Sequence, residues 1–208
     1  MTSTYNEFAG QSVERLAALS DGIFGVSMTL LLLDLHVPAR DLVHSERDLW
    51  RVLAELSPQL LVYLMSFMTL GIFWVGQQTQ LNQLERSDRH LTWIHLAFLF
   101  PVTLMPFSTR LLAEFMAYRA ALLLYWSNIA LLGGALYLSW GRANRAGLVK
   151  KDMSPEIPAA VCRRITIAQS LYAFGAALSY FGTFYSIAFI VLVQLNYVVA
   201  PFGPRSRA

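Results

Sequence analysis

Cysteine and charged residues are scarce in this sequence. The single cysteine, Cys162, excludes an internal disulfide and a thiolate metal cluster. Charged residues make up 14% of the 208 positions, whereas they make up about a quarter of a typical soluble domain. Hydrophobic residues make up 56%. This balance indicates an integral membrane protein, and the modest net charge of +3 gives no support for a nucleic-acid partner.

The sequence also lacks the motifs of common catalytic and metal sites. It contains no His-Glu-x-x-His pair, no phosphate-binding glycine loop and no Ser/His/Asp arrangement with nearby motif context. The four histidines, which show no metal-ligand spacing, are His36, His44, His90 and His95. We therefore expect no catalytic residue, no cofactor and no metal site. Without a basic cluster or a small-residue cleavage site, the N-terminal region does not resemble a secretory signal, so we expect the first apolar run to stay in the mature protein.

Long apolar runs predict an all-α integral membrane protein with six transmembrane helices in one domain, residues 1–208. The predicted spans cover about residues 16–35, 58–76, 91–108, 120–140, 165–181 and 184–200. Pro38 closes the first span. Pro101 and Pro106 in the third span favour a packed bundle, because the backbone carbonyls that they free need partners on neighbouring helices. A short amphipathic helix over residues 49–56 is expected in the headgroup layer.

Arginine and lysine fall unevenly on the two sides of these spans. With the N-terminus inside, eleven lie on the inner side and five on the outer side, and six of the eleven are in residues 141–164. The positive-inside rule therefore places both termini in the cytoplasm. The same rule explains the basic connection between the fourth and fifth spans.

The first span carries Arg15, Ser20 and Asp21 within an otherwise apolar run. An ionised side chain in the hydrocarbon layer is costly unless it is paired or hydrated. On a helical wheel, one narrow face holds Arg15, Leu19, Gly22, Val26, Leu30 and Leu33, with Thr29 at its margin. Two interpretations remain open at this point. The face packs against a neighbouring helix, or several copies surround one axis and form apolar rings that gate ions by dewetting.

The residues of this span match a known signature. The run 15–21, Arg-Leu-Ala-Ala-Leu-Ser-Asp, together with residues 29–31 and Asp34, resembles the Arg-x-x-x-Phe-Ser-Asp signature of the transmembrane protein 175 family of potassium channels. Residues 71–74 and 104–109 are similar to that family's second and third spans. The chain departs from the pattern at three positions, which are Leu19 in place of phenylalanine and Gln77 and Gln78 in place of frequent histidines.

The resemblance implies a bacterial-type channel in the cell's inner (plasma) membrane. Four six-span subunits would surround a pore lined by the first span, and potassium would be favoured over other monovalent cations. The family's constriction layers fall on Val26, Leu30 and Leu33, which lie on the face that the wheel identifies. Its selectivity threonine falls on Thr29. We expect weak selectivity, because the Thr-Val-Gly-Tyr-Gly carbonyl filter of ordinary potassium channels is absent.

The polar residues of the first span are expected to have other roles. We predict that Ser20 and Asp21 point toward other spans, with Trp74 as a donor, and hold the pore helix in register. Arg15 would find a partner near the inner mouth, in the same subunit or the next. The alternative for Asp21 is a cation site that faces water. Asp34 either concentrates cations at the outer mouth or is an ordinary solvated helix end.

Two other functions are compatible with a membrane bundle. A secondary transporter or small-solute permease would use Asp21 as a coupling site, and a structural scaffold would leave the pattern of the first span without a role. Inverted repeats would support a transporter. No convincing repeat relates residues 1–105 to residues 106–208. We therefore expect a homotetrameric cation channel whose partners are monovalent cations and membrane lipid.

Overall fold

The computed structural model describes residues 12–35, 37 and 39–199. The helices are α2 (Val13–Leu30), α3 (Glu46–Glu55), α4 (Ser57–Leu81), α5 (Arg89–Glu114), α6 (Arg119–Arg145), α7 (Ile157–Ala177) and α8 (Thr183–Val199). Short 3₁₀ turns cover Leu31–Asp34, Arg40–Leu42 and Leu178–Tyr180. In this part of the chain the only β pairing is an isolated bridge between Leu84 and Val149, so the all-α prediction is confirmed.

Each predicted span coincides with one helix, but not every helix is long and apolar enough to cross a membrane. Among the described residues, four are long and apolar enough, namely Val13–Leu33, Ser57–Leu81, Arg89–Glu114 and Arg119–Arg145. The apolar segment of α8, Thr183–Val198, is shorter, and α7 carries adjacent arginines near its start. By length and composition, four helices therefore qualify as membrane spans. The count of six spans stays a prediction. The expected helix stop at Pro38 lies outside the described residues.

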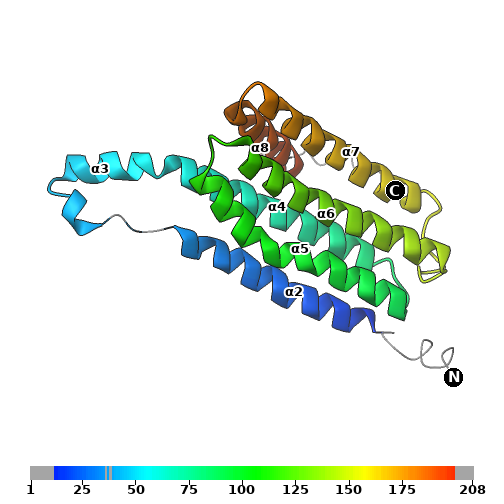
Figure 1. Cartoon of the computed structure of the whole chain (residues 1–208). Helices are drawn as coiled ribbons and strands as arrows, with labels where there is room; N and C mark the ends of the chain where they lie inside the picture. The colour runs from blue at the N-terminus through cyan, green and yellow to red at the C-terminus, as the bar shows by residue number, and fades with distance from the viewer. Residues whose placement is uncertain (1–11, 36, 38, 200–208) are drawn as a thin grey trace.

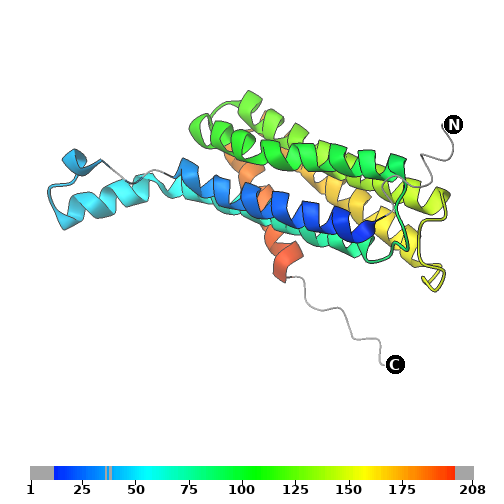
Figure 2. The ribbon, with the colours of Figure 1, turned by 90° about the horizontal axis from the view of Figure 1, so that it is seen from below.

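The helices form an elongated bundle with α2 at one edge. Figure 1 shows α7 and α8 at the opposite edge and α4, α5 and α6 between them. In both views α3 extends beyond the bundle, and none of its residues is buried (Figures 1 and 2). This helix occupies the region for which the sequence predicts an amphipathic surface helix.

The centre of the bundle is apolar and closely packed. Its fully buried aliphatic side chains come from α4, α5 and α6, and include Val62, Met65, Leu70, Val102, Met105, Leu122, Ile129 and Leu132. Because lipid tails are as apolar as leucine, helices in a membrane associate through close packing and hydrogen bonds rather than through burial from water. The polar contacts inside the bundle are therefore important for holding the helices together.

One polar cluster joins four helices near the middle of the bundle. Thr109 of α5 donates to the Ser66 hydroxyl at 2.7 Å, and Ser66 of α4 donates to the Tyr125 hydroxyl of α6 at 3.2 Å. Gln194 of α8 donates to the Thr69 hydroxyl at 2.6 Å. All five side chains are buried. These contacts fix α8 against α4, although α8 is the shortest helix of the bundle proper.

The two prolines lie inside α5, as the sequence predicts. Between them, the carbonyl of Pro101 accepts a hydrogen bond from the Asn128 side chain of α6 at 3.1 Å. The same amide nitrogen lies 3.3 Å from the Ser108 hydroxyl. The carbonyls that the prolines free are those of Ala97 and Val102, four residues earlier, so the Asn128 contact is an additional polar link between α5 and α6.

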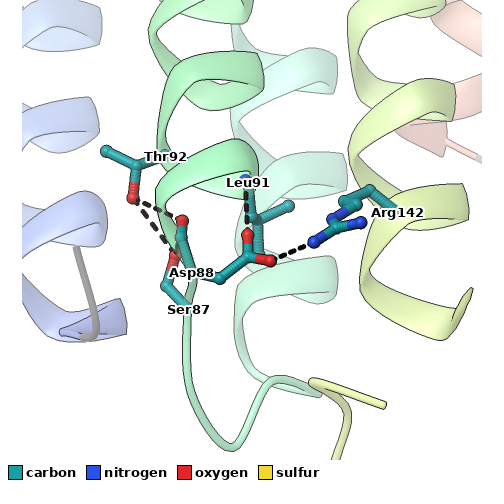
Figure 3. Close-up of polar contacts among 5 residues, drawn as sticks. All are labelled: Ser87, Asp88, Leu91, Thr92 and Arg142. Carbon is teal, nitrogen blue, oxygen red and sulfur yellow. Dashed lines mark hydrogen bonds and ion pairs between the residues drawn. The ribbon is translucent and has the colours of Figure 1, made fainter. Parts of the chain in front are cut away.

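The beginning of α5 is tied to the end of α6 through Asp88 (Figure 3). The Asp88 carboxylate caps the helix by accepting from the Leu91 backbone N–H at 2.7 Å, and it forms an ion pair with Arg142. Thr92 donates to the Asp88 carbonyl at 2.9 Å. Burial by itself raises the pKa of Asp88, but the Leu91 hydrogen bond and Arg142 outweigh it, so the pKa lies below the ordinary value. The ionised carboxylate therefore stabilises this end of the bundle.

Candidate pore-lining helix and its polar contacts

The helix that carries the signature, α2, begins with a regular cap. The Ser12 hydroxyl accepts from the backbone N–H of Arg15 at 3.2 Å, and Glu14 places a negative charge in the first turn. The α-helix ends at Leu30 and tightens into the 3₁₀ turn Leu31–Asp34. An α-helical wheel therefore stops applying at Leu30, since successive residues of a 3₁₀ helix are about 120° apart.

One face of α2 is covered by the rest of the chain. Its buried residues are Leu16, Ser20, Phe24, Ser27 and, in the 3₁₀ turn, Leu31. This face packs on α4 and α5, and the rings of Phe24 and Phe98 lie 6.0 Å apart. The helix is thus fixed in its rotation about its own axis.

The opposite face of α2 is not covered by the described residues of its own chain. Val26 is 59% exposed, Leu30 41% and Leu33 70%. Figure 2 shows α2 in front of the bundle, with no helix of the described chain over it. Among the described residues, no helix is therefore packed over the face that the wheel identifies.

An open groove of about 390 Å³ follows this uncovered face. It is lined by Leu19, Gly22, Val26 and Leu30, with Thr103 contributed by α5. Thr29 is exposed beside the groove, and its hydroxyl donates to the Val26 carbonyl at 2.8 Å. The hydroxyl proton of Thr29 is thus directed to its own helix, which leaves the hydroxyl oxygen able to accept or to contact a cation.

Ser20 connects α2 to both helices behind it. Its hydroxyl donates to the Leu16 carbonyl at 2.9 Å and accepts from the Gln77 amide of α4 at 2.7 Å. The same oxygen lies 2.8 Å from Nε2 of His95 on α5. All three side chains are buried. Nε2 of His95 also lies 3.3 Å from the Gln77 side-chain nitrogen, so the three side chains contact one another pairwise.

Asp21 is bound by α4 alone. Its Oδ1 accepts from the indole N–H of Trp74 at 2.8 Å and from the side-chain amide of Gln78 at 2.7 Å. The predicted contact between Asp21 and Trp74 is therefore present. Hydrogen bonds to a charged acceptor are stronger than neutral ones, so these two donors offset part of the cost of a carboxylate at this depth.

Part of this arrangement is not predicted from the sequence. Gln77 and Gln78 depart from the family pattern, yet each donates to one residue of the signature. The spacing of the histidines gives His95 no role as a metal ligand. Its position on one helical stripe with Phe98, Val102 and Met105, all of which are buried, is a signal for another role. A polar residue on a buried stripe requires a polar partner.

The remaining predicted site residues are placed as follows. The Arg15 side chain makes no ion pair with any residue in the described chain. The backbone of Asp34 ends the 3₁₀ turn, and its side chain lies outside what the structure describes. Within the described residues, no group of three or more His, Cys, Asp or Glu side chains is arranged to hold a metal ion. The charged residues of this segment thus lie near its two ends, except for Asp21, which binds α4.

Comparisons with known proteins identify relatives of this chain. The family model described as endosomal/lysosomal potassium channel TMEM175 matches residues 15–106, which include most of α2, all of α4 and most of α5. A protein named as a potassium channel in Streptomyces collinus is 32% identical over 158 residues, which cover 74% of this chain and 75% of the relative. A protein named as a potassium channel in Chamaesiphon minutus is 28% identical over 191 residues, covering 89% and 93%.

A solved structure has the same fold. The crystal structure of a lysosomal potassium-selective channel TMEM175 homolog from Chamaesiphon minutus superimposes with a TM-score of 0.77 at 24% identity. The match covers 90% of this chain and 97% of that one. The family model matches the signature region, and a relative that is 32% identical is matched over 75% of its length. The chain therefore belongs to the TMEM175 family.

Proposed function

We propose that this protein is a potassium-conducting cation channel. The observation that carries the proposal is the division of α2 into a face bound to its own subunit and an aliphatic face that its subunit leaves uncovered. The relatives named as potassium channels support it, since this chain matches 75% and 93% of their lengths. The family is one of ion channels rather than of enzymes, and we expect no catalytic activity.

The channel is a homotetramer in which four copies of α2 surround a common axis. Val26, Leu30 and Leu33 then form stacked apolar rings over roughly 12 Å, given a rise of about 1.5 Å per residue in the α-helix and about 2.0 Å in the 3₁₀ turn. An aliphatic constriction closes to ions when it dewets, and an ion that passes it must shed part of its water. Potassium loses water at lower cost than sodium, so selectivity favours potassium. It is weak, because side chains in the rings offer no oxygen atoms in place of water.

The polar contacts behind α2 hold these rings in register. Ser20 is bound from α4 and α5, and Asp21 is bound from α4, so rotation of α2 would break hydrogen bonds on both. Thr29 contributes a hydroxyl between the Val26 and Leu30 layers, where it affects selectivity. Arg15 finds its partner at the inner mouth, and four copies of Asp34 attract cations at the outer mouth. These roles require the assembled tetramer.

In the membrane, the chain forms one six-span domain with both termini in the cytoplasm. The uneven distribution of arginine and lysine supports this orientation in the inner membrane of a prokaryotic cell. The polar cluster on Gln194 supports a spanning position for α8, because a helix packed on buried groups of α4 enters the bundle rather than lying on its surface. Residues 1–208 act as a single unit in this arrangement.

Single-channel recording tests the proposal. Purified protein in a planar bilayer with potassium on both sides should give unitary currents. Replacing potassium by sodium on one side should shift the reversal potential only modestly, because the proposed selectivity is weak. An alternating-access transporter with Asp21 as its coupling site would give no unitary steps, because it turns over far too slowly. Solute uptake without unitary currents would support the transporter instead, and the absence of both would leave only a scaffold.

A further inference from the structure

A second cavity lies on the side of the bundle away from α2. It has a volume of about 210 Å³ and is enclosed by α4, α6, α7 and α8. For comparison, an apolar cavity of roughly 150 Å³ holds benzene. None of the residues assigned to the pore lines this cavity, so it needs an explanation of its own.

The lining of this cavity changes character along its length. Ile72, Phe73 and Ala168 make one part apolar. Thr79, near the end of α4, and Arg164, near the start of α7, lie toward the end of the bundle that carries the basic connection between α6 and α7. Figure 1 shows that α4 ends and α7 begins at this same end. The cavity thus combines an apolar interior with a polar, positively charged end.

Arg164 is the charged residue of this lining. Its guanidinium lies over the Tyr197 ring, 5.8 Å from the centroid, and it has no ion pair in the described part of the chain. Gln80 also lines the cavity, and its side-chain nitrogen is buried without a hydrogen-bond partner among the described residues. A cation and an unused N–H donor beside an apolar cavity favour an amphiphile with an anionic, acceptor-rich head.

We propose that this cavity binds an anionic phospholipid. The headgroup phosphate pairs with Arg164 at the basic end, and one acyl chain enters the apolar part between α4 and α7. The orientation fits this occupant, because the basic end faces the cytoplasmic leaflet in the proposed topology and basic pockets between helices on that side suit anionic headgroups. A zwitterionic lipid would bring a second cation to a site that already has one and lacks an acid.

Native mass spectrometry of the purified full-length protein tests this site. The protein is incubated with equal amounts of phosphatidylglycerol and phosphatidylcholine, and the lipid retained on each subunit is counted. We expect phosphatidylglycerol to be retained in preference. Arg164→Gln should reduce its retention roughly tenfold, because a charge-assisted hydrogen bond contributes about that factor to affinity. Arg164→Lys, which keeps the charge, should retain most of the lipid and shows whether a failure comes from folding.

Two matched controls separate the site from general surface effects. Arg163→Gln removes the same charge from the neighbouring position, which does not line the cavity, and should leave retention unchanged. Ala168→Leu fills the apolar part and should reduce retention, whereas Ala159→Leu on the exposed side of α7 should not.

The proposal is overturned by any of three results. Equal retention of the two lipids would mean annular binding, and equal effects of Arg163→Gln and Arg164→Gln would mean diffuse charge attraction. Displacement of the lipid by millimolar inorganic phosphate alone would mean a simple anion site. The readout is lipid mass, so its failure would leave the proposed conduction untouched.

Discussion

The two faces of α2 differ in another way than the faces of a helix in a soluble protein. The covered face combines Ser20 and Ser27 with Leu16, Phe24 and Leu31, while the face left open by the described chain carries the apolar Val26, Leu30 and Leu33. In water such an arrangement would be unstable. In a membrane, polar groups are satisfied inside the bundle and apolar ones need no cover. Hydrophobicity alone therefore does not separate the two faces, whereas the hydrogen bonds on Ser20 mark the covered one.

The largest effect is expected from a change on the open face. Leu30→Asn places an amide in the proposed constriction, which hydrates it and should raise the potassium current several-fold. The measurement is macroscopic current in liposomes or bilayers at matched protein content. Leu124→Asn on the exposed face of α6 is the control, since Leu124 is 42% exposed, against 41% for Leu30, and belongs to another helix. Equal currents for wild type and Leu30→Asn would show that Leu30 is not part of the constriction.

A change on the covered face should act on stability first. Ser20→Ala leaves the Gln77 amide and the His95 ring buried with fewer partners, which should lower the free energy of unfolding by about 2 kcal/mol. Thermal unfolding in detergent measures this loss. Ser27→Ala is a suitable comparison, because Ser27 is also buried on α2 and has no side-chain contact of this kind in the described chain. Equal melting temperatures for the two variants would mean that the Ser20 contacts do not hold the helix.

Asp21 should show a smaller effect, since it is more exposed than Ser20. Asp21→Asn keeps one side-chain oxygen for Trp74 and Gln78 but loses the charge, and should cost about 1 kcal/mol of stability. Asp21→Ala, which removes the acceptor, should cost more. Both effects are read from unfolding together with the assembly state. A stable, fully assembled Asp21→Asn protein without conduction would show instead that Asp21 is a cation site.

The smallest effect concerns a contact remote from both faces. Because the pKa of Asp88 is lowered in the folded protein, its ionised form contributes stability that is fully present above the unfolded value near 3.8 and is lost as the pH falls through the folded pKa. Unfolding at pH 7 and pH 3 should therefore differ more for wild type than for Asp88→Asn. At pH 7 this variant should conduct normally, which separates general stability from the function of α2. An identical pH response in both proteins would contradict the lowered pKa.

Much of this arrangement is predictable from local patterns. Apolar runs predict each helix, and the wheel identifies the open face of α2, because both depend on residues close in sequence. The pairing of Asp21 with Trp74 was also predicted. The contact of Ser20 with Gln77 and His95 was not predicted. It depends on how α4 and α5 are rotated about their own axes, and the two partners lie 57 and 75 positions from Ser20 in the sequence. The change to a 3₁₀ turn after Leu30 is likewise invisible to a wheel with a fixed angle.

The span count shows a second limit of local patterns. Apolar content predicts α7 and α8 as spans, yet by length and composition only the four earlier helices of the described chain qualify. Gln194 and Thr69, which lie 125 positions apart, link α8 to α4 by a hydrogen bond. Such long-range polar contacts leave no periodic trace in the sequence.

Modification of a single cysteine introduced in place of Leu30 tests the central claim most directly. The only native cysteine, Cys162, is first replaced by serine, and Leu30→Cys is compared with Leu124→Cys on the exposed face of α6. If the open faces of α2 meet around a shared pore, a charged methanethiosulfonate reagent will change the potassium current through the Leu30→Cys channel and leave the Leu124→Cys channel unaffected. Complete labelling of the Leu30→Cys protein with an unchanged current would contradict a pore lined by α2.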